Sequence, residues 1–138
     1  MMMEMIEPNW KEIAGRFFKY VKKTKSCWIW KGLISTNGYG RFFYHGKQRQ
    51  AHRVIYEYYN GKIPKMFCMD HLCRVRACVN PNHLEVVTNR ENILRGIGPT
   101  ARNARKLFCN YGHEFILENT MPLKSRYGGD ERRCRACN

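Results

Sequence analysis

The stretch DHLCRVRACVNPNHLEVVTNREN, residues 70–92, decides the expected fold of this 138-residue chain. Short apolar runs at 66–69 and 84–87 each have the length and composition of a strand. A capping-box pair opens TNRENILRG, residues 88–96, and a glycine closes it, which predicts a helix. The expected order is therefore strand, loop, strand and helix.

Three residues of this stretch suit a zinc ion. Cys73, Cys78 and His83 follow one another with four residues between neighbours, and a closed zinc site needs a fourth ligand. Cys68 lies in an apolar run, where a free cysteine behaves as a small buried hydrophobe. Cys27 opens a predicted strand and could lie at a sheet end, so we favour Cys27. A site with only three protein ligands would instead leave an open, catalytic position.

A second ligand set lies near the C-terminus, where apolar residues are few. Cys109 and His113 read C-x3-H, and Cys134 and Cys137 read C-x2-C. Four such ligands in two close pairs suit a tetrahedral structural zinc. Because this tail has no other source of folding free energy, we expect zinc binding to fold it.

Asp70, His71 and Asn92 remain in the quoted stretch once the zinc ligands are set aside. Carboxylate and amide oxygens suit a hard cation such as Mg²⁺, and a neutral imidazole can take a proton from water. Together they suit hydrolysis of a phosphodiester. From spacing alone, an equally good interpretation is that Asp70 and Asn92 cap turns and that His71 is an ordinary surface histidine.

The N-terminal half predicts an amphipathic helix over residues 9–23 and a second helix over 51–64, where a glycine and a proline give a stop. Strand-like runs at 27–31, 39–44 and 47–51 predict a small antiparallel sheet. The expected fold class is therefore α+β, held together by two structural zinc sites.

The composition favours a nucleic-acid partner. Lys and Arg number 25 against 11 Asp and Glu, a net charge of +14, which attracts polyanions. The opening MMMEMIEPNW lacks a basic segment followed by a long apolar run, so we expect no signal peptide. No stretch is apolar over the length needed to span a bilayer, so we expect no membrane partner. A cytoplasmic setting keeps thiols reduced, and seven cysteines cannot all pair within one chain.

The quoted stretch resembles the core of HNH endonucleases, the ββα-metal or His-Me finger superfamily. HLC, a following Cys, NPxHL and a downstream Asn are similar to the His-Cys box homing endonucleases. The wider frame resembles small HNH proteins of bacteriophages over roughly residues 16–138. Its motifs are CWIW, GYGRF, AHR, DHLC, CVNPNHLE and REN, followed by a tail that ends RCRACN.

The resemblance assigns roles to the leftover residues. His71 matches the general base, Asn92 the metal-binding asparagine, and Asp70 the metal ligand that precedes the base in many HNH enzymes. The ligand set with Cys27 matches the first zinc site of the His-Cys box group. Two departures remain: that group lacks a carboxylate at the position of Asp70, and its second zinc module has a different spacing.

The resemblance implies a metal-dependent DNA endonuclease that hydrolyses phosphodiester bonds in double-stranded DNA with Mg²⁺ or Mn²⁺, beside two structural Zn²⁺. The alternative is a zinc-stabilised DNA-binding protein without catalysis. A homodimer stays open, because a duplex cut by one-metal sites usually needs two of them. Homing and phage DNA processing both stay open, and a phage-encoded chain would act in the host cell cytoplasm.

Six basic residues are candidate DNA contacts. A two-stranded ribbon fits the major groove, and the predicted hairpin over 39–51 is rich in base-reading side chains. Arg53 lies at the start of the predicted helix over 51–64, where it could reach a phosphate. Arg74 and Arg76 lie in the zinc loop, where they would contact phosphate. The candidates are Arg41, Lys47, Arg49, Arg53, Arg74 and Arg76.

The expected organisation has three parts. Residues 1–96 would form the nuclease core, with the N-terminal helix, the DNA-binding sheet and the strand–loop–strand–helix segment. Residues 97–106 would be a basic linker, and residues 107–138 a C-terminal zinc-binding module.

Overall fold

The computed structural model describes residues 9–44, 46–124 and 129–138. Residues 1–8, on which the expected lack of a signal peptide rests, lie outside the described residues. The chain divides into two compact units, unit 1 (Met1–Asn92) and unit 2 (Ile93–Asn138). Within the part that the structure describes, no helix has the length and apolar character needed to cross a membrane.

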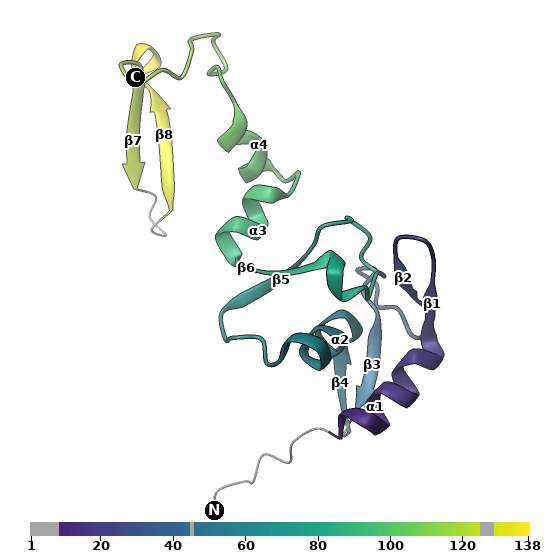
Figure 1. Cartoon of the computed structure of the whole chain (residues 1–138). Coiled ribbons are helices and arrows are strands. Elements are labelled where there is room, and N and C mark those ends of the chain that lie inside the picture. Colours follow the sequence, from purple (N-terminus) through teal and green to yellow (C-terminus); the bar gives the residue numbers. More distant parts are fainter. Residues whose placement is uncertain (1–8, 45, 125–128) are drawn as a thin grey trace, which may run out of the picture. The chain divides into compact units, whose positions relative to one another are not determined.

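Unit 1 alternates short helices with two-stranded antiparallel ladders (Figure 1). The ladders pair β1 with β2, β3 with β4, and β5 with β6. Its elements are α1 (Trp10–Phe17), η1 (Phe18–Tyr20), β1 (Val21–Lys23), β2 (Trp28–Trp30), β3 (Arg41–Tyr44), β4 (Lys47–Gln50), α2 (Ala51–Asn60), β5 (Phe67–His71), η2 (Pro81–His83), β6 (Leu84–Thr88) and the first part of α3 (Asn89–Arg95).

The N-terminal helix is shorter than its sequence predicts. Asn9 caps α1 as expected, accepting a bond of 3.4 Å from the backbone N–H of Glu12. The helix ends at Phe17, however, and the chain enters β1, which pairs Val21 with Trp30. This pairing occupies β2, so the three predicted strands do not form one sheet, and β3 and β4 form a ladder of their own.

Three aromatic rings form the centre of the core of unit 1. Phe17 lies 4.7 Å from Trp30 and 5.2 Å from Phe42 between ring centroids, and each is at most 3% exposed. Gly40 allows the close approach of backbone to this core, since a Cβ there would lie 2.6 Å from Cδ1 of Trp30. Buried aliphatic residues of α2 complete the cluster.

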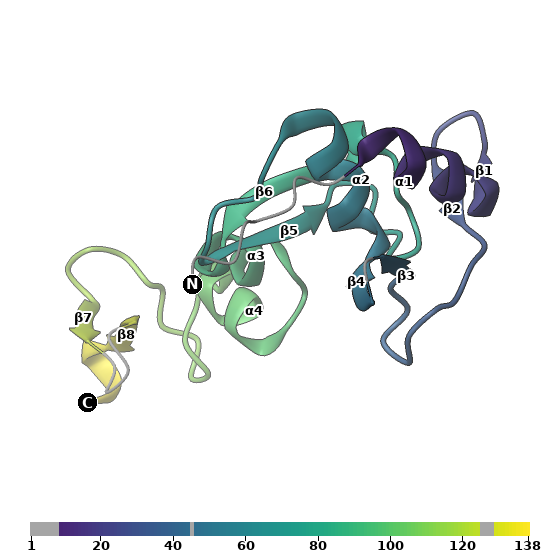
Figure 2. The same ribbon diagram turned by 90° about the horizontal axis from the view of Figure 1, so that it is seen from below.

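The β5–β6 hairpin and α3 follow the predicted order of strand, loop, strand and helix. The hairpin is antiparallel, with Phe67 opposite Thr88 and His71 opposite Leu84 (Figure 2). The capping box is reciprocal: Thr88 N–H donates to Oε2 of Glu91 at 2.9 Å, and Glu91 N–H donates to Oγ1 of Thr88 at 3.2 Å. These local bonds fix where the helix begins.

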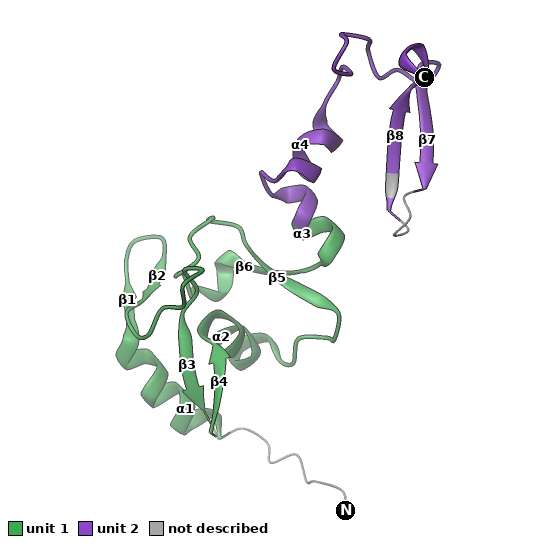
Figure 3. Cartoon of the chain, turned by 180° about the vertical axis from the view of Figure 1, so that it is seen from behind, with its two compact units in different colours: residues 1–92 green, residues 93–138 purple. Residues whose placement is uncertain are grey.

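Unit 2 contains the rest of α3, then α4 (Pro99–Arg105), β7 (Thr120–Lys124), β8 (Asp130–Cys134) and η3 (Arg135–Cys137) (Figure 3). The segment expected as a linker thus carries a helix, and Ala101 on it is fully buried. Arg132 ties the end of α4 to the β7–β8 hairpin, donating to the backbone oxygens of Asn103 at 2.8 Å, Ala104 at 3.3 Å and Lys106.

Candidate active site and metal clusters

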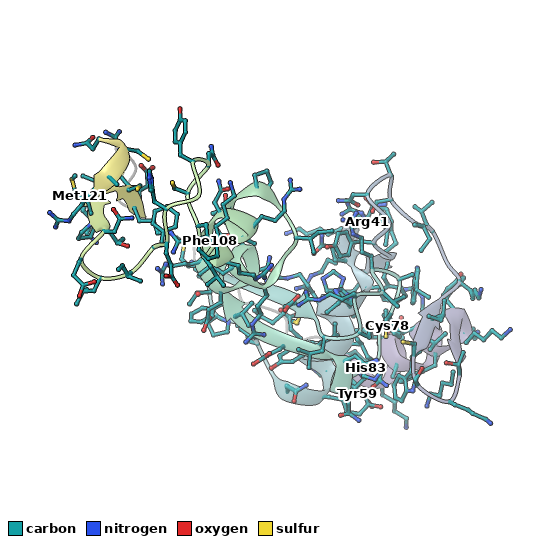
Figure 4. All side chains as sticks on the ribbon, turned by 90° about the horizontal axis from the view of Figure 1, so that it is seen from above. Arg41, Tyr59, Cys78, His83, Phe108 and Met121 are labelled. Atoms are coloured by element: carbon teal, nitrogen blue, oxygen red, sulfur yellow. The ribbon has the colours of Figure 1, made fainter. Side chains whose placement is uncertain are left out.

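Four Cys and His side chains converge in unit 1. The ligand atoms of Cys27, Cys73, Cys78 and His83 all lie within 4.8 Å of one another; Figure 4 shows Cys78 close to His83. Nδ1 of His83 is 3.6 Å from Sγ of Cys27 and 3.6 Å from Sγ of Cys78. Two such atoms bound to one tetrahedral zinc lie roughly 3.6 Å apart, so the geometry fits that ion.

Backbone bonds hold β2 against the segment that carries these ligands. Val79 N–H donates to the oxygen of Trp28 at 2.7 Å, and Trp30 N–H donates to the oxygen of Ala77 at 2.9 Å. Asn80, which is 7% exposed, donates its side-chain amide to the oxygen of Ser26 at 2.9 Å. The sequence analysis missed Asn80, although an Asn before Pro is a signal for a turn.

Cys68 does not join either cluster. Its Sγ lies 3.7 Å from Oδ1 of Asn89, on the side of β5 that α3 approaches. The structure thus brings Cys27 rather than Cys68 to the other three ligands, because the β2 contacts place Cys27 beside the loop.

The second ligand set converges in unit 2. Nδ1 of His113 lies 3.6 Å from Sγ of Cys109, 3.1 Å from Sγ of Cys137 and 3.7 Å from Sγ of Cys134. The sulfurs of Cys109 and Cys137 are 3.7 Å apart, close to the ~3.8 Å edge of a tetrahedral zinc site. Four protein ligands at these distances leave no open position for a substrate.

His71 lies buried at the end of β5, with 6% of its surface exposed. Its Nε2 lies 3.1 Å from the backbone oxygen of Cys78, so the Nε2–H donates there and leaves the lone pair on Nδ1. Burial lowers the pKa of His71, although the carbonyl of Cys78 and the carboxylate of Asp70 act in the opposite direction. The ring is therefore neutral near pH 7, the state in which it can accept a proton.

Two further rings enclose His71, and the sequence analysis gave neither a place in the site. His52, in the first turn of α2, lies 4.8 Å from His71 between ring centroids, and Tyr39 lies 5.8 Å from it. His52 is 3% exposed, and burial, with smaller contributions from His71, Arg53 and Arg41, lowers its pKa to about 3. The sequence feature that could have pointed to His52 is its place in AHR, at the start of α2.

Asp70 precedes His71 on β5, and side chains of successive strand residues point to opposite faces. Its carboxylate is 4% exposed and accepts a bond of 2.8 Å from Nη1 of Arg74, a residue with positive φ. Glu85 lies directly opposite on β6, which places a second carboxylate on the same face of the hairpin. Sequence patterns alone did not single out Glu85, because strand register decides this pairing.

Asn92 lies half-buried in the first part of α3. The contact of Cys68 with Asn89 indicates which faces meet here. Cys68 and Asp70 share one face of β5, as strand residues two apart do. Asn89 and Asn92 share one face of α3, as helix residues three apart do. The contact therefore places Asn89, at the start of α3, beside Cys68 of β5.

The hairpin register divides the three predicted ribbon contacts between two faces. Arg41 is opposite Gln50 and shares its face with exposed Phe43 and Gln48. Arg49 is opposite buried Phe42 and binds Glu57 of α2 at 2.8 Å, on the inner face. Lys47 falls on this inner face by register but is exposed at the end of the strand.

The remaining basic candidates lie around His71. Arg53 follows His52 in the first turn of α2, and its charge contributes to the lowered pKa of His52. Arg74 pairs with Asp70. Arg76 donates to the backbone oxygen of Asn37 at 2.9 Å, and its guanidinium carbon lies 5.7 Å from the ring centroid of Tyr39.

Comparison with known proteins finds a family match for the middle of the chain. A model of the HNH endonuclease family matches residues 49–94. Protein 7.7 of Escherichia phage T7 is 35% identical over 68 residues, which are 49% of this chain and 52% of that protein. Protein 2.8 of the same phage is 33% identical over 84 residues, which are 59% of this chain and 57% of that protein.

The Uncharacterized gene 5.3 protein of Enterobacteria phage T3 is 36% identical over 49 residues, which are 36% of this chain and 48% of that protein. The chain thus spans about half the length of the curated relatives it matches. No solved structure matches the chain. The segment of residues 49–94 that matches the HNH endonuclease family model includes α2, the β5–β6 hairpin and most of α3.

Proposed function

We propose that the chain is a metal-dependent endonuclease that hydrolyses phosphodiester bonds of double-stranded DNA, with His71 as general base. The observation that carries the proposal is the setting of His71 inside the segment that the HNH family model matches. Its Nε2–H donates to the Cys78 carbonyl, which leaves Nδ1 without a proton. An imidazole fixed in one tautomer is prepared to take a proton from an attacking water.

Asp70 and Asn92 would hold a divalent ion, Mg²⁺ or Mn²⁺, through a carboxylate and an amide oxygen. When bound, such an ion stabilises charge on the phosphate and on the leaving oxygen. The contact between Asn89, at the start of α3, and Cys68, which shares its strand face with Asp70, supports this pairing. Arg74, now bonded to Asp70 at 2.8 Å, would turn to a DNA phosphate, since its side chain is 56% exposed.

The two Cys/His clusters would each hold a structural Zn²⁺. In unit 1, the Cys27 cluster fixes the loop between β5 and β6 and so fixes the backbone oxygen of Cys78 that orients His71. In unit 2, the Cys109 cluster replaces the apolar core that the tail lacks. Removal of the first ion would therefore disable His71 without removing any catalytic atom.

The outer face of the β3–β4 hairpin would lie in the major groove of the duplex. Arg41, Gln48 and Gln50 share this face, and Arg and Gln side chains can read guanine and adenine edges respectively. Arg53, Arg74 and Arg76 would contact phosphates near the reacting bond. Because the relatives named above are phage proteins, we place the reaction in the cytoplasm of a host cell, and cutting both strands there would need two copies of the chain.

Cleavage of supercoiled plasmid with and without Mg²⁺ tests the proposal. His71→Gln is the decisive variant, because its amide can still donate to the Cys78 oxygen while no base remains. We expect cleavage to fall by ~10²–10⁴-fold, with zinc content and DNA affinity unchanged. Asn92→Ala should also cut more slowly, and excess Mg²⁺ or Mn²⁺ should partly restore it, which should not happen with His71→Gln.

Two results would contradict the proposed endonuclease activity. The first is a wild type that cuts no DNA with any divalent ion, and the second is a His71→Gln variant that cuts as fast as the wild type. Retained DNA binding in either case would favour the alternative, a zinc-stabilised DNA-binding protein without catalysis.

A further inference from the structure

Tyr111 of unit 2 is an exposed aromatic residue on a rigid turn. It lies between two cluster ligands, Cys109 and His113, and 81% of its surface is exposed. Its backbone N–H donates to Sγ of Cys109 at 3.4 Å, and the next residue, Gly112, donates to the oxygen of Cys109 at 3.1 Å with a φ of 86°. The backbone that carries the ring is therefore already ordered, so ligand binding there would cost little conformational entropy.

Arg135 occupies the corresponding place in the other ligand loop. It lies between Cys134 and Cys137, is exposed, and has its backbone fixed by an N–H bond of 2.9 Å to the oxygen of Asn119. The four ligand atoms of the cluster lie within 4.8 Å of one another, so the two loops meet at one end of unit 2. The two loops of this cluster therefore carry one exposed aromatic ring and one exposed arginine.

The charge of unit 2 points to the class of ligand. Residues 93–138 contain nine Lys and Arg against four Asp and Glu, which favours a polyanion. An exposed ring and a positive charge on the two loops of one cluster suit an unpaired base with its phosphate. Within a paired duplex the base faces are covered by their neighbours, so the ring selects single strands.

We propose that the ligand-loop end of unit 2 binds single-stranded DNA, with a base stacked on Tyr111 and a phosphate held by Arg135. This contact is separate from the duplex-binding hairpin of unit 1 and does not depend on catalysis. It would let the chain bind unpaired DNA through unit 2.

Fluorescence anisotropy of a labelled 20-nucleotide oligothymidine and of a matched duplex tests the proposal on the full chain, in buffer without Mg²⁺. Tyr111→Ala should weaken single-strand binding by about 5- to 150-fold and duplex binding by less than about twofold. Tyr111→Phe, which keeps the ring, should bind as the wild type does. Arg135→Gln should weaken single-strand binding and lower its salt slope by about 0.7.

Lys124→Gln is the matched control for charge. Lys124 lies at the opposite end of β7 from Thr120, which pairs with Cys134, so its loss should leave single-strand binding nearly unchanged. Zinc content of each variant shows that unit 2 is folded. Wild-type affinity in Tyr111→Ala, or an equal loss for the duplex, would overturn the proposal. Plasmid cleavage is scored separately, so failure of this contact and failure of the nuclease give different results.

Discussion

Arg41 and Arg49 lie eight residues apart on one hairpin, yet the same substitution should affect two different properties. Arg41 shares the outer face with exposed Phe43, whereas Arg49 binds Glu57 beneath the hairpin at 2.8 Å. We therefore compare Arg41→Met with Arg49→Met. The first should weaken DNA binding and leave thermal stability unchanged, and the second should do the reverse.

The magnitudes follow from exposure. The Glu57 side chain is 12% exposed and that of Arg49 is 36% exposed, so this ion pair lies between a surface pair and a buried one. Loss of Arg49 should cost about 1–3 kcal/mol of unfolding free energy, which lowers Tm by about 4–8 °C per kcal/mol in a unit of this size. Loss of a base contact at Arg41 should weaken binding by about 5- to 150-fold.

Thermal unfolding followed by circular dichroism gives the first quantity, and duplex binding measured over a range of salt concentrations gives the second. A phosphate contact at Arg41 would weaken all sequences alike and lower the salt slope by about 0.9, whereas a base contact would relax preference at one position. The double variant Arg49→Met with Glu57→Leu should recover part of the lost stability. Equal losses of DNA affinity in both single variants, with unchanged Tm, would refute the assignment of faces.

Three other predictions use the metal clusters, the core and the buried histidine. Metal analysis should find two zinc ions per wild-type chain, one in Cys134→Ser and two in Cys68→Ser; loss of an ion from Cys68→Ser would contradict the cluster assignment. Gly40→Ala should lower unfolding free energy by about 1–3 kcal/mol because its Cβ meets the core, whereas Gly15→Ala, with nothing within 4 Å in the helix, should raise it by about 0.5–1 kcal/mol. In the unfolded chain His52 binds a proton below about pH 6.5, whereas in the folded chain it does so only near pH 3. As the pH is lowered from 6.5 to 3, the free energy of unfolding should therefore decrease more steeply in the wild type than in His52→Gln. Parallel curves from denaturant unfolding would exclude this contribution.

The parts of the fold that could be predicted depend on local signals. The start of α3 follows from Thr88 and Glu91, whose side chains each accept a bond from the backbone N–H of the other, three positions away. The end of α2 follows from Gly61, which has a φ of 82° and donates its N–H to the oxygen of Glu57 at 3.0 Å. Such features need no information about the rest of the chain.

Features that depend on pairing between distant segments could not be predicted. The strand at Val21–Lys23 replaces helix only because β2 offers it a partner. The division of Arg41 from Arg49 depends on which residues face each other in the hairpin, since a shift by one residue exchanges the faces. Asn80 and Tyr39 likewise gain their places from contacts across long stretches of sequence.

The Cys27 cluster also sets an order of events during protein synthesis. Cys27 and His83, whose ligand atoms lie 3.6 Å apart, are separated by 56 residues of chain. At about 5–20 residues per second, a ribosome adds His83 about 3–11 s after Cys27. Over that interval the nascent chain lacks one of the four ligands, so the proposed zinc ion could not yet close the loop that holds the His71 ring. With the proposed function, competence to cut DNA would therefore come only once this late histidine has been added.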